Sequence, residues 1–184
     1  VYDSNAQKVV IAYRDVGNSN VGTAIVGTVS GASISFGSEV TFESGQSNYI
    51  AATFDSTNNK VVIAYQDAGN SYYATAVVGT VSGTSISFGT PVVFENATVS
   101  FISPVFDSNA NKVVIAYRDT GNSNYGTFTV GTVSGTSISF ETAVVFQTAN
   151  SYYNSATFDS SNNKVVNAYR NDGNSGYGTA VVFQ

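Results

Sequence analysis

Residues 54–95 read FDSTNNKVVIAYQDAGNSYYATAVVGTVSGTSISFGTPVVFE, and residues 106–147 read FDSNANKVVIAYRDTGNSNYGTFTVGTVSGTSISFETAVVFQ. The second stretch follows the first at a spacing of 52 residues, and 31 of the 41 positions from 54–94 match those of 106–146. The same period marks four aspartates and four lysines: Asp3, Asp55, Asp107 and Asp159, and Lys8, Lys60, Lys112 and Lys164. A fixed period of this length is the signature of a repeat architecture.

The period divides the whole chain. We treat residues 1–184 as a single repeat domain of about three and a half units, namely 1–53, 54–105, 106–157 and 158–184. The first unit is truncated at its start and the last unit at its end.

Each unit contains four runs typical of β-strands. In the second unit, strand A covers 49–55, strand B 60–66, strand C 75–81 and strand D 85–94, with a bend predicted in strand D. These runs are rich in β-branched and aromatic residues, and turn-forming residues separate them. No window shows the 3.6-residue periodicity of a helix. The sequence therefore predicts an all-β fold.

Strand B has an unusual hydrophobic pattern. Its core, VVIAY at 61–65, is apolar on both faces, which is typical of a sheet that is covered on both sides. Four short strands repeated every 40 to 50 residues resemble the blades of β-propellers in general, over the whole chain. No named blade family matches, because the chain lacks a Trp-Asp dipeptide, a kelch signature and a Trp-containing Asp-box. The resemblance implies a β-propeller of four-stranded antiparallel blades, and a β-solenoid is the alternative.

The incomplete repeat count bears on assembly. A closed propeller has about 4 to 8 blades, and closure removes exposed faces and sheet edges. We therefore expect a homodimer that closes a ring from two chains, or a chain that is part of a longer repeat array.

Composition excludes several function classes. Seven basic residues and 12 acidic ones give a net charge of -5, without the Lys and Arg clusters that bind phosphate backbones or anionic membranes. The longest apolar run is about five residues, whereas a membrane-spanning helix needs roughly 20. Without His or Cys the chain has no Ser-His-Asp triad, no cysteine nucleophile and no ordinary zinc site. We expect no nucleic acid, no membrane and no cofactor as partners.

The copies differ from each other in two places. Residues 95–105 and 147–157 share only 2 of 11 positions, so divergence is concentrated in the D-to-A connection and along strand A. A milder cluster lies in the B-to-C connection. In an up-and-down blade these two connections emerge on the same face, and loops on a rigid scaffold commonly carry binding residues. The pattern predicts a ligand face there, although neutral drift of loops would produce the same divergence.

The variable regions contain aromatic rings beside neutral hydrogen-bonding side chains, a combination that neutral sugars favour. Three arginines recur at one position near the end of strand B and distantly resemble the arginine cluster of sialidase propellers. An ion pair or hydrogen bond to the neighbouring Asp loop would explain these arginines structurally, and packing between blades would explain the rings. The candidate ligand-binding residues are Gln46, Asn48, Tyr49, Tyr72, Phe101, Asn124, Tyr152, Tyr153, Asn154, Arg14, Arg118 and Arg170.

The pattern of aspartates gives little support for either a glycosidase site or a calcium site. The candidates for a glycosidase pair are Asp15, Asp67, Asp119 and Asp172. A glycosidase needs two carboxylates in different environments, whereas these recur unit by unit. The D-x-G-N-S loops carry one Asp each, too few for a calcium loop and sufficient for a tight turn.

These observations predict a non-catalytic repetitive binding module, lectin-like or adhesive, that works outside the cell or on a virion or cell surface. A neutral glycan is the expected partner. A purely structural spacer without a small ligand is the alternative, and a glycosidase is a distant one.

Overall fold

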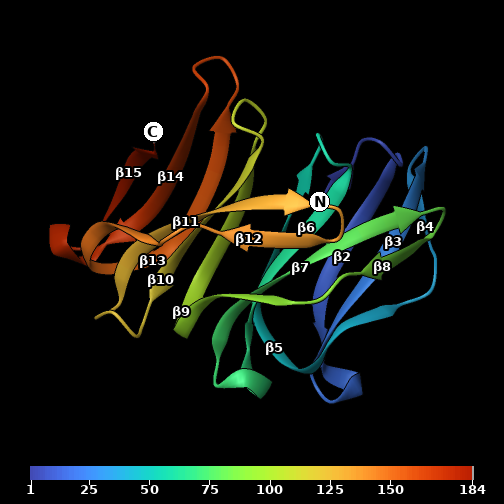
Figure 1. Cartoon of the computed structure of the whole chain (residues 1–184), viewed down its shortest axis with the longest axis horizontal. Helices are drawn as coiled ribbons and strands as arrows, with labels where there is room; N and C mark the ends of the chain where they lie inside the picture. Colours follow the sequence, from blue (N-terminus) through green and yellow to red (C-terminus); the bar gives the residue numbers. More distant parts are fainter. Residues whose placement is uncertain (184) are drawn as a thin grey trace.

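The computed structural model describes residues 1–183 and shows an all-β chain, as the sequence predicts (Figure 1). Fifteen strands form one antiparallel sheet with the order β1-β2-β3-β5-β6-β7-β9-β10-β11-β13-β14-β15, while β4, β8 and β12 pair with β3, β7 and β11. In residues 1–183 the two ends of this path, β1 and β15, do not pair with each other, so the sheet is open.

The strands follow the 52-residue period. In the structure each unit is counted from its long strand, so the second, third and fourth units begin at Val40, Val92 and Val144 rather than at the sequence-based bounds. The first unit holds β1 (Tyr2–Asp3), β2 (Lys8–Asp15), the 3-10 turn η1 (Val16–Asn18), β3 (Val21–Ser30) and β4 (Ser33–Phe36). The second holds β5 (Val40–Asp55), β6 (Lys60–Asp67), η2 (Ala68–Asn70), β7 (Tyr73–Ser82) and β8 (Ser85–Phe88). The third holds β9 (Val92–Asp107), β10 (Lys112–Asp119), β11 (Tyr125–Ser134) and β12 (Ser137–Phe140). The fourth holds β13 (Val144–Asp159), β14 (Lys164–Asn171), η3 (Asp172–Asn174) and β15 (Tyr177–Phe183).

The A-to-B turn is the same in every unit. Asp55 Oδ1 accepts hydrogen bonds from the backbone N of Thr57 at 3.0 Å and of Asn58 at 2.9 Å, which is an Asx-type turn. Asp3, Asp107 and Asp159 make the equivalent pair of bonds. These four aspartates, which mark the repeat period, are therefore turn residues.

The D-to-A connection is where the structure departs from the sequence-based expectation. No loop separates strand D from the next strand A, because each of β5, β9 and β13 is a continuous strand of 16 residues. The first part of β5 pairs with β3 and the second part with β6, so one strand joins two units. The bend predicted in strand D is real and splits off the four-residue strand β8.

The predicted β-propeller is therefore not supported. Separate blades around a channel need connections that let each small sheet end, and here the sheet continues from one unit into the next through the shared strand. The arrangement partly fits the β-solenoid alternative, because corresponding strands of successive units pack together, β5 against β9 and β9 against β13. Figure 1 shows the units arranged side by side along the long axis of the molecule, from blue to red.

The core consists of apolar clusters between consecutive units, as the doubly apolar strand B predicts. In the first cluster Val10 and Val26 of the first unit pack against Val61, Ile63 and Tyr65 of the second. The next cluster joins the second unit to the third through Val62, Val78, Val113, Ile115 and Tyr117. A smaller cluster around Val114, Ala116, Val165 and Phe183 joins the third unit to the fourth. Each unit is thus held by burial against its neighbours.

None of the helical segments in the described residues is both long enough and apolar enough to cross a membrane.

Candidate functional site

A bulge interrupts each of the three long strands at an aromatic residue. In the β5–β6 ladder Asn48 lies opposite Gln66 and Ala51 opposite Ala64, so β5 carries one extra residue in between. Tyr49 occupies this bulge with a φ of 49°, in the left-handed region. Phe101 in β9 (φ 53°) and Tyr153 in β13 (φ 56°) occupy the same place. A left-handed backbone is a genuine outlier for such a bulky side chain and costs of order 1–3 kcal/mol.

The three bulges bring their rings into one row. The ring centroids of Tyr49 and Phe101 lie 5.6 Å apart, and those of Phe101 and Tyr153 lie 4.9 Å apart. Tyr152 joins the row at 5.6 Å from Phe101. Tyr49 and Tyr153 are 45% and 65% exposed, so the row presents ring surface to solvent. We call Tyr49, Phe101, Tyr152 and Tyr153 the aromatic row.

Two of the predicted arginines lie on the aromatic row. The guanidinium of Arg118 is 4.9 Å from the ring centroid of Phe101 and 4.6 Å from that of Tyr152, and Arg118 Nε donates to Ser100 Oγ at 2.9 Å. Arg170 lies 5.2 Å from the ring centroid of Tyr152 and pairs with Asp172 at 3.0 Å. The predicted contact with the Asp loop is confirmed for Arg170 and is wrong for Arg118, which contacts Ser100 of β9 instead.

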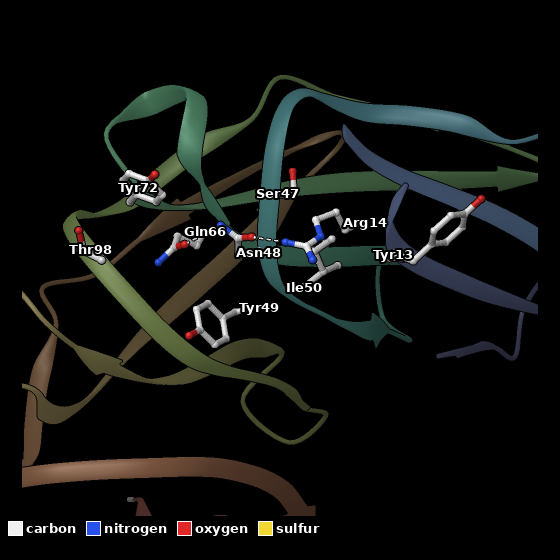
Figure 2. Close-up of a pocket in the computed structure, with 10 residues that line it drawn as sticks. Tyr13, Arg14, Ser47, Asn48, Tyr49, Ile50, Gln66, Tyr72 and Thr98 are labelled. Carbon is white, nitrogen blue, oxygen red and sulfur yellow. Dashed lines mark hydrogen bonds between the residues drawn. The ribbon is translucent and has the colours of Figure 1, made fainter. Parts of the chain in front are cut away.

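A pocket of about 800 Å³ lies at the end of the row, at the junction of the first two units (Figure 2). Tyr49 and Tyr72 contribute rings, and Arg14, Asn48 and Gln66 contribute polar groups. The remaining lining residues are Ala12, Tyr13, Ser47, Ile50 and Thr98.

A chain of hydrogen bonds orients the polar side chains of the pocket. Arg14 Nη1 and Gln46 Nε2 both donate to Asn48 Oδ1, at 2.9 and 3.2 Å. Asn48 Nδ2 donates to Gln66 Oε1 at 2.9 Å, and Gln66 Nε2 donates to the backbone oxygen of Val99 at 2.5 Å. Because each amide is held by its neighbours, the pocket presents its donors and acceptors in fixed directions.

The divergence between copies explains why the pocket lies at this junction. At the position of Asn48 the later units carry Ser100 and Tyr152, and at the position of Gln66 they carry Arg118 and Arg170. At the junction of the third and fourth units, the guanidinium of Arg118 stacks on the ring of Tyr152. The positions that differ between units are thus the ones that shape the pocket.

The structure assembles most of the predicted ligand-binding residues and leaves two of them aside. Gln46, Asn48, Tyr49, Tyr72 and Arg14 gather at the pocket, and Phe101, Tyr152, Tyr153, Arg118 and Arg170 continue along the row. Asn154 instead turns toward the sheet, where its Oδ1 accepts from Ser151 Oγ and Asn167 Nδ2, both at 3.0 Å. Asn124 lies in the turn before β11, and its backbone oxygen accepts from the backbone N of Ser151.

Four polar or aromatic residues that line the pocket were not among the residues predicted from the sequence, namely Tyr13, Ser47, Gln66 and Thr98. Tyr13 lines the pocket, while Tyr65 and Tyr117 at the same position are fully buried. Its place in the first unit is the signal that could have singled it out. Ser47 and Thr98 carry no distinguishing pattern.

A second polar cluster lies inside the second and third units. Tyr65 Oη donates to Glu43 Oε2 at 3.0 Å, and Tyr117 Oη donates to Glu95 Oε2 at 3.1 Å. Burial, together with the charge of Asp119, raises the pKa of Glu95, and burial also raises the pKa of Asp119. In the fourth unit Gln147 and Asn171 replace both acids. The amides keep the local contacts, since Gln147 Nε2 donates to Tyr169 Oη at 3.3 Å and Asn171 Oδ1 accepts from the backbone N of Gly173.

We expect the double variant Glu95→Gln, Asp119→Asn to be more stable than the wild type at pH 7. An acid whose folded pKa is raised binds its proton more tightly when folded, so its charged form destabilises the fold at neutral pH and protonation removes that cost. Thermal unfolding from pH 7 downward should show the difference in Tm shrinking as the pH falls through the raised pKa values.

Asp159 provides the matched control for this pH dependence. Hydrogen bonds from Asn162 and Ser161 lower the pKa of Asp159, so its charged form contributes stability above its unfolded pKa, and Asp159→Asn should lower Tm at pH 7. A double variant that is less stable than wild type at pH 7, with no change in the gap on acidification, would contradict the assignment.

The aspartates near the ends of the B strands serve the turns. The Oδ1 atoms of Asp15, Asp67 and Asp119 each accept from a backbone N three residues later at 3.1 Å, and Asn171 rather than Asp172 takes this place in the fourth unit. Among residues 1–183, no group of three or more Asp, Glu, His or Cys side chains could hold a metal ion. The arrangement offers ring surface and directed amide and guanidinium groups. No protein-family model matches the chain, and no curated protein matches it.

Proposed function

We propose that the chain is a non-catalytic repetitive binding module, lectin-like or adhesive, that binds a neutral glycan at the pocket and along the aromatic row. One observation carries this proposal. The bulge position is aromatic in all three copies and left-handed in all three, although the residues around it have diverged. An aromatic residue at a backbone position that suits glycine suggests a function for the exposed ring.

The pocket chemistry supports a neutral ligand. Binding pockets combine apolar and aromatic surface with a few placed polar groups that fix orientation. Tyr49 and Tyr72 offer faces for the apolar side of a sugar ring, while the guanidinium of Arg14 and the amide of Asn48 offer hydrogen-bonding groups for hydroxyl groups. Within the described part of the chain, the pocket lining contains no carboxylate, and Arg14 is its only charged side chain.

Repetition supports an adhesive role. The rings at the three bulges lie within one row, so one extended glycan can contact several of them. Linked weak contacts raise the overall affinity without any single strong site. Such a role fits an extracellular location or a virion or cell surface.

A structural spacer is the second candidate function. It is favoured by the later part of the row, where the guanidinium of Arg118 lies against both Phe101 and Tyr152 and fills the space that a ligand would need. The glycosidase alternative receives less support, because Asp15, Asp67 and Asp119 all accept hydrogen bonds within their own turns.

Replacing Tyr49 with alanine tests the proposal. Neutral oligosaccharides that the wild type binds on a glycan array are titrated by calorimetry into both proteins. We expect Tyr49→Ala to weaken binding about tenfold, the loss of about 1.4 kcal/mol typical of a central aromatic contact.

The control is Tyr177→Ala, which removes an even more exposed ring of β15 outside the pocket and should leave the affinity unchanged. The spacer function is favoured instead if the wild type binds no neutral glycan at millimolar concentration. It is also favoured if Tyr49→Ala and Tyr177→Ala behave alike.

A further inference from the structure

Every junction between units uses the same two faces. The forward face of a unit is formed by Val10, Ala12, Ala24 and Val26 or by their equivalents in the later units. The backward face is formed by Val9, Ile11, Ile25 and Ile34 or by their equivalents. In the cluster between the first two units, forward residues Val10, Ala24 and Val26 pack against backward residues Val61, Ile63, Val77 and Ile86 of the second unit. The cluster between the second and third units repeats this pairing with Val62, Ala64, Ala76 and Val78 against Val113, Ile115 and Ile138.

One backward face and one forward face are exposed in the 184-residue chain. On the backward face of the first unit Ile11 is 40% exposed, whereas Ile63 and Ile115 at the same position are 0% exposed. On the forward face of the fourth unit Val182 is 51% exposed, whereas Val26 and Val78 are 0% exposed. Ile34 and Ala180 are exposed in the same way. Exposed apolar patches of this kind mark interaction sites.

We infer that this chain associates head to tail, with the forward face of the fourth unit of one copy docked on the backward face of the first unit of a second copy. The two faces are complementary because their equivalents already pack against each other inside the chain. Val166, Ala168, Ala180 and Val182 stand where Val62, Ala64, Ala76 and Val78 stand in the second unit, and they meet the same residue types on the partner. When a second copy docks in this way, it forms one more junction between units, of the same kind as the junctions inside each chain.

The contact joins two different faces, so it is heterologous. Heterologous contacts build rings where the rotation closes and open series where it does not. The homodimer expected from the repeat count is one closed form of such a contact, with each copy presenting its forward face to the other. At the internal junctions a long strand also pairs with both units, as β9 does with β7 and β10. No such strand is part of the proposed contact, so we expect it to be reversible and dependent on concentration.

Sedimentation velocity and light scattering test this inference. The wild type should shift from monomer to larger species as its concentration rises to the millimolar range. Ile11→Asp and Val182→Asp should each abolish the shift, because each places a charge on one of the two faces. A mixture of the two variants should form a one-to-one dimer that does not grow, since each variant retains the face that the other has lost.

Val16→Asp is the matched control, because Val16 is 69% exposed in η1 and belongs to neither face. Circular dichroism checks that each variant is folded, and Ile34→Asp and Ala180→Asp replace any variant that is not. A wild type that stays monomeric at millimolar concentration overturns the inference. So does association that survives either face variant, or a mixture that does not re-form the dimer.

Discussion

Replacing Ile63 with alanine is expected to lower the free energy of unfolding by about 2–5 kcal/mol, the usual cost of removing three methyl or methylene carbons from a packed core. Ile63 is fully buried between the first two units, where it packs with Val10, Val26 and Tyr65. The cavity left behind cannot collapse easily, because strands on both sides hold its walls. Chemical denaturation followed by circular dichroism measures the difference.

The repeat supplies its own control for this substitution. Ile11 occupies the same position in the first unit but is largely exposed, so in dilute solution Ile11→Ala should cost less than about 1 kcal/mol. Ile115→Ala, buried between the second and third units, should behave like Ile63→Ala. Equal costs at Ile11 and Ile63 would mean that the two units do not pack as described.

The second large effect is expected at Gly89, which follows β8. A Cβ atom at this position would lie only 1.9 Å from the backbone oxygen of Thr136, in the turn between β11 and β12 of the next unit. Because the obstacle is backbone rather than a mobile side chain, two units must move apart to relieve it. Gly89→Ala should therefore destabilise the fold by about 3 kcal/mol, the upper end of the range for overpacking. Thermal and chemical unfolding of the variant both report this loss.

Substitutions at Gly37 and Gly178 provide two comparisons for Gly89→Ala. Gly37 meets Thr84 in the same way, and Gly37→Ala should be similarly destabilising. At Gly178 a Cβ atom would have no neighbour within 4 Å among residues 1–183, so Gly178→Ala should stay within about 0.5 kcal/mol of wild type. The third unit already carries Glu141 at the position of Gly89. A tolerated Gly89→Ala would show that consecutive units are not in close contact at their β-turns.

Much of the fold can be predicted from the periodic sequence. The predicted B strand of the second unit, 60–66, differs by one residue from β6, because a doubly apolar run between two turn signals is unambiguous. The Asx turns follow from an aspartate that precedes a turn in every unit. The structure does not support the propeller expectation, because propensity gives no sign that β5 continues through its bulge from one unit into the next. That continuity depends on pairing with β3 and β6, which are distant along the sequence.

The candidate site could be predicted only in part. Comparing copies identifies the positions around Asn48, Tyr49 and Tyr72, since sequence divergence is visible without a structure. Their geometry is not visible, because a left-handed aromatic residue in a strand contradicts local preference and is held in place by the surrounding sheet. Asn154 shows the opposite error, since its polarity suggested a ligand contact and the structure turns it toward Asn167.

The most direct test of glycan binding is a titration of the isotopically labelled chain with neutral oligosaccharides, followed by amide chemical shifts in NMR spectra. Binding at the pocket and aromatic row should shift the signals of Asn48, Tyr49, Gln66 and Tyr72 first, and those of Phe101 with longer oligosaccharides. The A-to-B turns at Asp55 and Asp107 should stay unchanged. No shifts at millimolar sugar, or shifts confined to those turns, would contradict a glycan-binding site at the left-handed bulges.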